Sequence, residues 1–107
     1  MSTLRNSVRL IGRVGNNPET TKFDNGIKVS LSLATSEYYY NAEKEKVETT
    51  HWHNLIAWGK TAEIIQKYVE KGKEIAIEGK LTYRNYEDKE GNKRYVTEIV
   101  VNEVVLF

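Results

Sequence analysis

Both tryptophans and both histidines of the chain lie in one short stretch, TTHWHNLIAWGK, residues 49–60. Indole rings stack on flat ligands, and imidazoles bind metals or transfer protons. The stretch could therefore belong to a core, to a metal site or to a surface on which aromatic ligands stack.

Strand alternation separates these side chains into two faces, because successive residues of a strand point to opposite sides. One face carries Trp52, Asn54, Ile56 and Trp58, and the other carries His51, His53, Leu55 and Ala57. Periodicity alone leaves open whether the tryptophan face is core or surface. A metal site at His51 and His53 lacks a third ligand, since no cysteine exists and no acid is fixed beside them, so we expect none.

The segment 73–84 places a ring in line with cations. Its apolar face holds Ile75, Ile77, Gly79, Leu81 and Tyr83, which predicts that Tyr83 lies in the core. The opposite face holds Lys80 and Arg84, followed by Tyr86. An exposed ring beside cations is the composition that single-stranded nucleic acids require, although an ordinary solvated face remains the alternative. In SEYYYN, at least one of Tyr38, Tyr39 and Tyr40 must point outward.

Length and composition limit the class of protein. The 107 residues suit one domain, residues 1–107, and the absence of cysteine excludes disulfides and thiol chemistry. No signal peptide or membrane span is visible, so we expect a cytoplasmic protein. The net charge of +1 predicts no partner by itself. Since nucleotide-binding loops and hydrolase motifs are also missing, we expect neither an enzyme nor a cofactor.

The pattern predicts strands with a single helix. We expect strands in 7–15, 22–36, 49–58, 73–84 and 93–107, with an Asn-Gly turn near residue 25 and loops at 41–48 and 85–92. Residues 60–72 change to helical period, with an apolar face of Ala62, Ile64, Ile65, Tyr68 and Val69 and a stop at Gly72. Five strands with a helix between the third and fourth are typical of the OB-fold, a small, partly open all-β barrel.

The chain resembles the bacterial single-stranded DNA-binding protein family, specifically its OB-fold domain. The matching blocks are VRLIGRVGNNPE, NGIKVSLSLATSE, THWHNLIAWGK, EIIQKYVEKGKEIAIEGKL and EGNKRYVTEIVVNEV, in order over nearly all of residues 4–105. The resemblance implies sequence-nonspecific binding of single-stranded DNA in replication, recombination and repair.

The same resemblance implies which residues bind. Bases would stack on Tyr39, Trp52, Trp58 and Tyr86, and the DNA backbone would follow Lys60, Lys71 and Arg84; strand alternation adds Lys80. Tyr39 and Tyr86 stand where better studied members carry tryptophan. Asn54 and Glu70 stand at positions that are often basic in the family. Phosphate contacts should therefore be fewer, which predicts that the DNA affinity depends only weakly on salt.

Assembly and partners are implied as well. The family forms homotetramers, which places His53 and the first-strand residues Val8 and Leu10 at subunit contacts; a dimer is the alternative. Family members continue into an acidic tail, whereas this chain ends at Phe107, so we expect no tail-mediated partners. Three other functions stay open: a protein-interaction module, an RNA-binding OB domain and a small nuclease.

Overall fold

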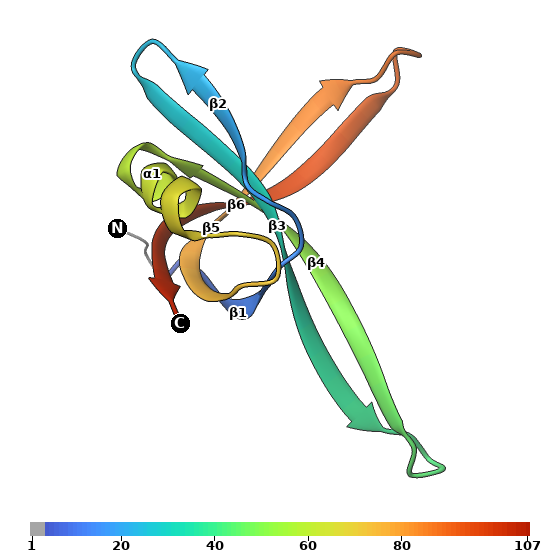
Figure 1. Ribbon diagram of the computed structural model, residues 1–107. Coiled ribbons are helices and arrows are strands. Elements are labelled where there is room, and N and C mark those ends of the chain that lie inside the picture. The colour runs from blue at the N-terminus through green and yellow to red at the C-terminus, as the bar shows by residue number, and fades with distance from the viewer. Residues whose placement is uncertain (1–3) are drawn as a thin grey trace.

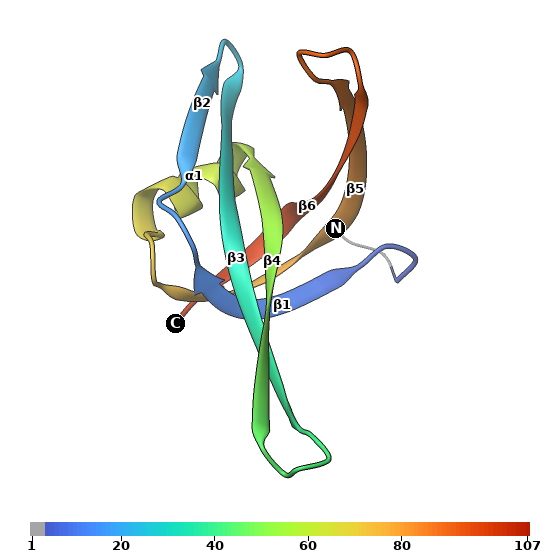
Figure 2. The same ribbon diagram turned by 90° about the vertical axis from the view of Figure 1, so that its right-hand side faces the viewer.

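The computed structural model describes residues 4–107, which form a small β-barrel from which three hairpins project (Figure 1). In chain order the elements are β1 (Val8–Val14), β2 (Glu19–Phe23), β3 (Gly26–Tyr40), β4 (Lys46–Trp58), α1 (Gly59–Tyr68), β5 (Glu74–Glu87) and β6 (Lys93–Leu106). The β3–β4 hairpin extends away from the barrel on the side opposite to the β2–β3 and β5–β6 hairpins (Figure 2).

Five strands close the barrel. The sheet order is β1-β5-β6-β4-β3-β2, and a further pairing of β1 with β3 closes the ring. All neighbours are antiparallel except β4 and β6, which are parallel and meet only at Leu55–Ile99 and Ile56–Val100. Helix α1 lies between β4 and β5, the third and fourth barrel strands, and β2 extends the sheet beyond β3. The predicted OB-fold is confirmed.

Ring closure depends on a close approach at Gly12. Here β1 runs alongside β5 and then pairs its last two residues with β3, through Arg13–Ala34 and Val14–Leu33. A Cβ atom at Gly12 would overlap the carbonyl oxygen of Ala34. Only glycine allows the two backbones to approach this closely.

The core follows from strand alternation. Every second residue of each barrel strand points inward, and the helix adds a narrow stripe. The buried cluster consists of Val14, Val29, Leu31, Leu33, Leu55, Ala57, Ala62, Ile65, Val69, Ile75, Ile77, Ile99 and Val101. All are aliphatic, so the rings of Trp and Tyr lie outside this cluster.

The helix is shorter than predicted and its buried stripe is narrower. It ends at Tyr68, while Gly72, at φ +89°, forms a later turn and donates its N–H to the carbonyl of Val14. Ile64 and Tyr68, predicted in the apolar face, are exposed. Ala62 and Ile65 of the helix, with Val69 just after it, are the buried side chains of this segment, so the buried stripe is narrower than the predicted apolar face. Within residues 4–107, no helix is long and apolar enough to span a bilayer.

The prediction for Tyr83 is wrong. Its side chain is 74% exposed although it follows the inward-facing Leu81 along β5. The β5–β6 hairpin runs past the barrel rim, where Tyr83 pairs with Thr97 and both faces of the ribbon meet solvent (Figure 1). Alternation identifies a face of a strand, but burial also requires a second layer to cover it.

Candidate nucleic-acid interface

The strand register places most of the predicted binding residues on one outer surface of the barrel. Directly opposed residues share a face, so Lys28 lies beside Trp58, and Ser32 beside Asn54. The Ile56–Val100 pair continues this face onto β6, and the Lys80–Val100 pair continues it onto β5. We call this surface the aromatic face; it carries Lys28, Ser30, Ser32, Trp52, Asn54, Trp58, Lys80, Thr82, Arg84 and Tyr86.

At one end of the aromatic face, Trp58 contacts a ring that the sequence analysis missed. Phe23 from β2 stacks on Trp58 with ring centroids 5.8 Å apart and an interplanar angle of 30°. The Nζ atom of Lys28 lies 5.7 Å from the centroid of the Trp58 ring. Trp58 remains 52% exposed, so its ring is not core. Alternation in residues 19–23 could have placed Phe23 outward, but only the sheet register brings it to Trp58.

Farther along β4, Trp52 lies across the backbone of Gly15. A Cβ atom at Gly15 would overlap the indole carbon Cζ3 and would lie 2.7 Å from Oγ of Ser32. Beside it, Oδ1 of Asn16 accepts hydrogen bonds of 2.8 Å from both the N–H and the hydroxyl of Ser32. These contacts fix one side of the indole, and the ring is still 62% exposed.

A polar depression of about 310 Å³ lies on the same face, beside β4, the strand that carries both tryptophans. It is lined by Asn16, Glu19, Ser30, Leu31, Ser32, Asn54, Leu55 and Glu98. Amide and hydroxyl groups can exchange hydrogen bonds with base edges or phosphates. The carboxylates of Glu19 and Glu98 instead repel phosphates, which limits the affinity of this depression for a polyanion.

Arg84 pairs with the carboxylate of Glu98. Its Nε and Nη2 donate to the two oxygens of Glu98 at 3.0 and 3.3 Å. The hydrogen bond and the negative charge of Glu98 raise the pKa of the Arg84 guanidinium. The guanidinium carbon also lies 5.9 Å from the ring centroid of Tyr86. Arg84 therefore supports the Tyr86 ring, but its charge is already partly balanced.

The three predicted lysines are exposed and lie apart from one another. Lys80 projects from the aromatic face, and Lys60 follows Trp58 by two residues at the start of α1. Lys71 lies beyond the helix, where its backbone N–H donates to Oδ1 of Asn17 at 2.9 Å. Among residues 4–107, none of the three forms an ion pair. All three charges are thus available to phosphates, at separate points of the surface.

Tyr39 lies on the other side of its ribbon from its neighbours. Tyr38 and Tyr40 pair with Glu48 and Lys46 and point to the same side of the sheet as the aromatic face. Tyr39 pairs with Val47 and points to the opposite side. All three rings are exposed. Nζ of Lys46 lies 4.4 Å from the centroid of the Tyr38 ring. The binding role of Tyr39 stays a prediction, and Tyr38 and Tyr40 are the rings in line with Trp52.

His53 lies half-buried on the inner side of β4. Its Nε2 is 2.9 Å from the hydroxyl of Thr35, and burial together with the charge of nearby His51 lowers the pKa of His53. Within residues 4–107, no group of three His, Asp or Glu side chains is placed to hold a metal ion.

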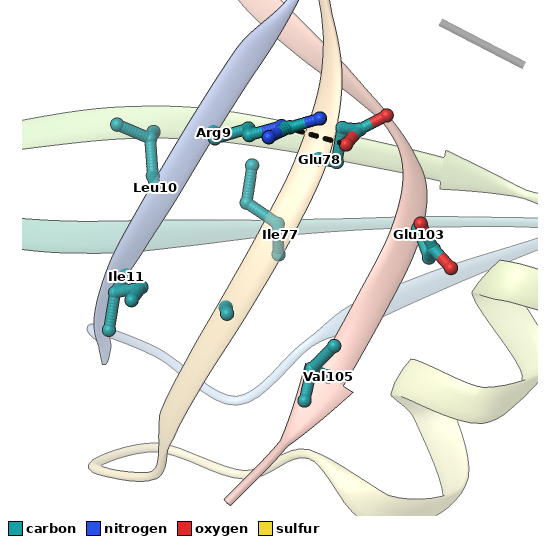
Figure 3. A pocket seen from close by; sticks show the side chains of 8 residues that line it. Arg9, Leu10, Ile11, Ile77, Glu78, Glu103 and Val105 are labelled. Atoms are coloured by element: carbon teal, nitrogen blue, oxygen red, sulfur yellow. Dashed lines mark hydrogen bonds and ion pairs between the residues drawn. The ribbon is translucent and has the colours of Figure 1, made fainter.

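A second surface is formed by β1, the first half of β5 and the end of β6 (Figure 3). We call it the aliphatic face; it carries Arg9, Ile11, Ala76, Glu78, Glu103 and Val105 around a shallow cavity of about 380 Å³. Ile11 is 62% exposed, and Nε of Arg9 lies 2.9 Å from Oε2 of Glu78. Val8 and Leu10 pack partly against the core, so Ile11 and Val105 are the exposed aliphatic side chains here.

Comparison with known proteins assigns the family. Residues 5–107 match the model of the single-strand binding protein family. Single-stranded DNA-binding protein 1 of Chlorobaculum tepidum is 43% identical over 101 residues, and the single-stranded DNA-binding protein of Bacteroides thetaiotaomicron is 42% identical over 102. Each alignment covers 92% of this chain, which spans only 62% and 63% of the two relatives.

Solved structures give the same result. The Plasmodium falciparum SSB in complex with ssDNA superposes with a TM-score of 0.88 at 26% identity, covering 100% of this chain and 97% of that one. A deletion mutant of the single-stranded DNA binding protein from Thermus aquaticus gives 0.81 at 25% identity, covering 95% and 50%. The chain therefore belongs to the single-strand binding protein family.

Proposed function

We propose that this protein binds single-stranded DNA along the aromatic face, without sequence preference and without catalysis, and acts in the cytoplasm during replication, recombination and repair. The observation that carries the proposal is the placement of Trp52, Trp58 and Tyr86 as exposed rings on one surface, with a cation beside two of them: Lys28 at Trp58 and Arg84 at Tyr86. Family membership and the relative solved with ssDNA support it.

Stacking supplies most of the binding free energy in this proposal. A base stacked on an aromatic side chain contributes about 1–3 kcal/mol and every base has a π-face, so the rings tolerate any sequence. The aromatic face also excludes double-stranded DNA as the preferred ligand, because the bases of a duplex are already stacked on one another.

Phosphate contacts are few. Among the cations proposed to contact the strand, Lys28, Lys60, Lys71 and Lys80 form no ion pair within residues 4–107, whereas Arg84 pairs with Glu98. At about 0.7 per neutralised phosphate on a single strand, four contacts give a slope of log Kobs against log salt of about −3. We therefore expect this protein to stay bound to single-stranded DNA at salt concentrations that release strongly basic proteins from DNA.

We propose further that the protein forms homotetramers in which the aliphatic face contacts another subunit. Exposed aliphatic side chains such as Ile11 and Val105 favour burial against protein. The Arg9–Glu78 ion pair balances two of the three charges of the same surface, the third being Glu103, which lowers the cost of removing the surface from water. His53 on the inner side of β4 stays assigned to subunit contact as part of this proposal.

The direct test measures binding of fluorescently labelled oligo-dT by anisotropy at increasing salt. We expect Trp52→Ala and Trp58→Ala each to weaken binding by about 1–3 kcal/mol. Lys80→Gln should flatten the salt slope by about 0.7. A wild-type protein that fails to bind oligo-dT at low salt would refute the proposal.

The RNA-binding alternative is tested by the same measurement with oligo-U. Only RNA carries the 2′-hydroxyl, which a protein must contact to select it. We expect oligo-dT to bind at least as tightly as oligo-U. A strong preference for oligo-U would replace DNA with RNA as the ligand.

A further inference from the structure

We propose that Phe23, Lys28 and Trp58 form a subsite for one nucleotide of the bound strand, in which Phe23 is a stacking ring and Lys28 contacts the phosphate. This inference rests on the proposed function and extends it. The family resemblance assigns stacking to Trp58, but it assigns no role to Phe23 or Lys28.

The two rings support each other. Phe23 pairs with Gly26 across the β2–β3 hairpin, and Lys28 pairs with Trp58 across β3 and β4, so the register fixes both rings beside the same stretch of β3. At 5.8 Å and 30° the rings are in the favourable range for offset stacking. Phe23 remains 49% exposed. The pair is thus held in place before ligand arrives and still offers ring surface to a base, which lowers the ordering cost of binding.

A cavity adjoins the pair. It measures about 380 Å³ and is lined by Phe23, Asn25, Gly26, Ile27, Trp58 and Gly59. Gly26 and Gly59 have φ values of +148° and +61°, and apart from the adjoining backbone and chain neighbours no heavy atom lies within 4 Å of a Cβ built at either position. The space above both α-carbons is therefore open, and a flat ring can approach the backbone closely. The amide of Asn25 can hydrogen-bond to a base edge.

Charge indicates a nucleotide rather than an uncharged aromatic ligand. Lys28 holds its ammonium group 5.7 Å from the centroid of the Trp58 ring, and Lys60 follows Gly59 in the chain. A base on the rings with its phosphate at Lys28 would use both features. The site is also continuous with the rest of the aromatic face through Trp58, so a strand crossing Trp52 can continue into it.

The experiment measures oligo-dT affinity of the full chain at one low salt concentration. We expect Phe23→Leu to weaken binding by about fivefold or more, the lower end for one stacked base. Phe23→Tyr keeps a ring and should bind within about twofold of wild type. Both rings hold the same base, so the two substitutions should not be additive. The double variant Phe23→Leu/Trp58→Leu should bind oligo-dT less than about twofold more weakly than Trp58→Leu alone.

Tyr68→Leu is the matched control. Tyr68 is 54% exposed on α1, and Nζ of Lys67 lies 5.4 Å from its ring centroid, so it offers a similar ring and cation away from the aromatic face. This variant should bind as wild type does.

Lys28→Gln tests the same subsite without removing a ring, which covers the case in which Phe23→Leu loosens the hairpin. It should flatten the salt slope by about 0.7. If Phe23→Leu and Lys28→Gln both bind as wild type does while Trp52→Ala binds weakly, the subsite is rejected and the proposed function stands. If Trp52→Ala also binds as wild type does, the proposed function fails as well.

Discussion

The aromatic face and the aliphatic face both expose large apolar side chains, but the polar and charged groups beside those side chains differ. The aromatic face carries exposed rings, a polar depression and two lysines, Lys28 and Lys80, that have no ion-pair partner in the described chain. On the aliphatic face, the side chains are branched and Arg9 is already paired with Glu78. Flat rings with free cations suit a strand of bases and phosphates, whereas aliphatic groups beside an arginine that is already paired suit another protein surface.

The largest expected effect is on assembly. Ile11→Glu places a carboxylate on the aliphatic face, where burial of a charge without a partner costs several kcal/mol. We expect the variant to dissociate toward the monomer in size-exclusion light scattering while each subunit still binds oligo-dT. Ile64→Glu is the control, because Ile64 is an exposed isoleucine on α1. An Ile11→Glu variant with the wild-type mass would contradict the assignment of this face.

The next effect concerns how the aromatic face holds its rings. Gly15→Ala adds a methyl group against Trp52 and Oγ of Ser32, and overpacking of this kind costs about 1–3 kcal/mol. The free energy of unfolding in urea should fall, and oligo-dT should bind more weakly because the indole is displaced. Wild-type values of both quantities would show that the ring is not fixed by Gly15.

A smaller effect tests the charge balance of the aromatic face. Glu98→Gln removes the carboxylate that pairs with Arg84 and lines the polar depression. Arg84 then becomes available to a phosphate, so oligo-dT should bind more tightly and the salt slope should steepen by about 0.7. Weaker binding would instead mean that the ion pair positions Arg84 for DNA. Thermal unfolding should be measured alongside, because the loss of the pair also affects the fold.

The smallest effect is the pH dependence of stability from His53. Burial and the charge of His51 lower its pKa, so the folded protein favours the neutral imidazole. The unfolded chain, with an ordinary histidine pKa of about 6.5, then binds more protons on acidification. The contribution of neutral His53 to the free energy of unfolding is complete above the unfolded pKa of about 6.5. It is lost as the pH falls from there through the lower pKa of the folded protein. Tm should drop between pH 7.5 and 5.5, and the drop should be smaller in His53→Gln.

Sequence alone predicted the features that depend on local period. Alternation placed Trp52 and Trp58 on one face of their strand and Leu55 on the other, and the element order gave the OB-fold. Only the family resemblance predicted that the tryptophan face points outward. The prediction of burial from alternation failed for Tyr83. A strand keeps its alternation after it leaves the barrel, but no second layer covers it there.

The remaining features depend on register between distant strands. Phe23 meets Trp58, and Glu98 pairs with Arg84, only because β2, β3, β4, β5 and β6 align in one particular way. No local pattern in the sequence contains those distances. On the β3–β4 hairpin, local alternation separates Tyr39 from Tyr38 and Tyr40, but only the register shows that Tyr38 and Tyr40 share the face of Trp52.

The most direct measurement follows the fluorescence of each tryptophan separately during titration with oligo-dT. Trp52→Phe leaves Trp58 as the reporter, and Trp58→Phe leaves Trp52. If bases stack along the aromatic face, both variants should be quenched at the same strand concentration, while equal amounts of duplex DNA should quench neither. Unchanged emission from both tryptophans at saturating oligo-dT and low salt would contradict the account.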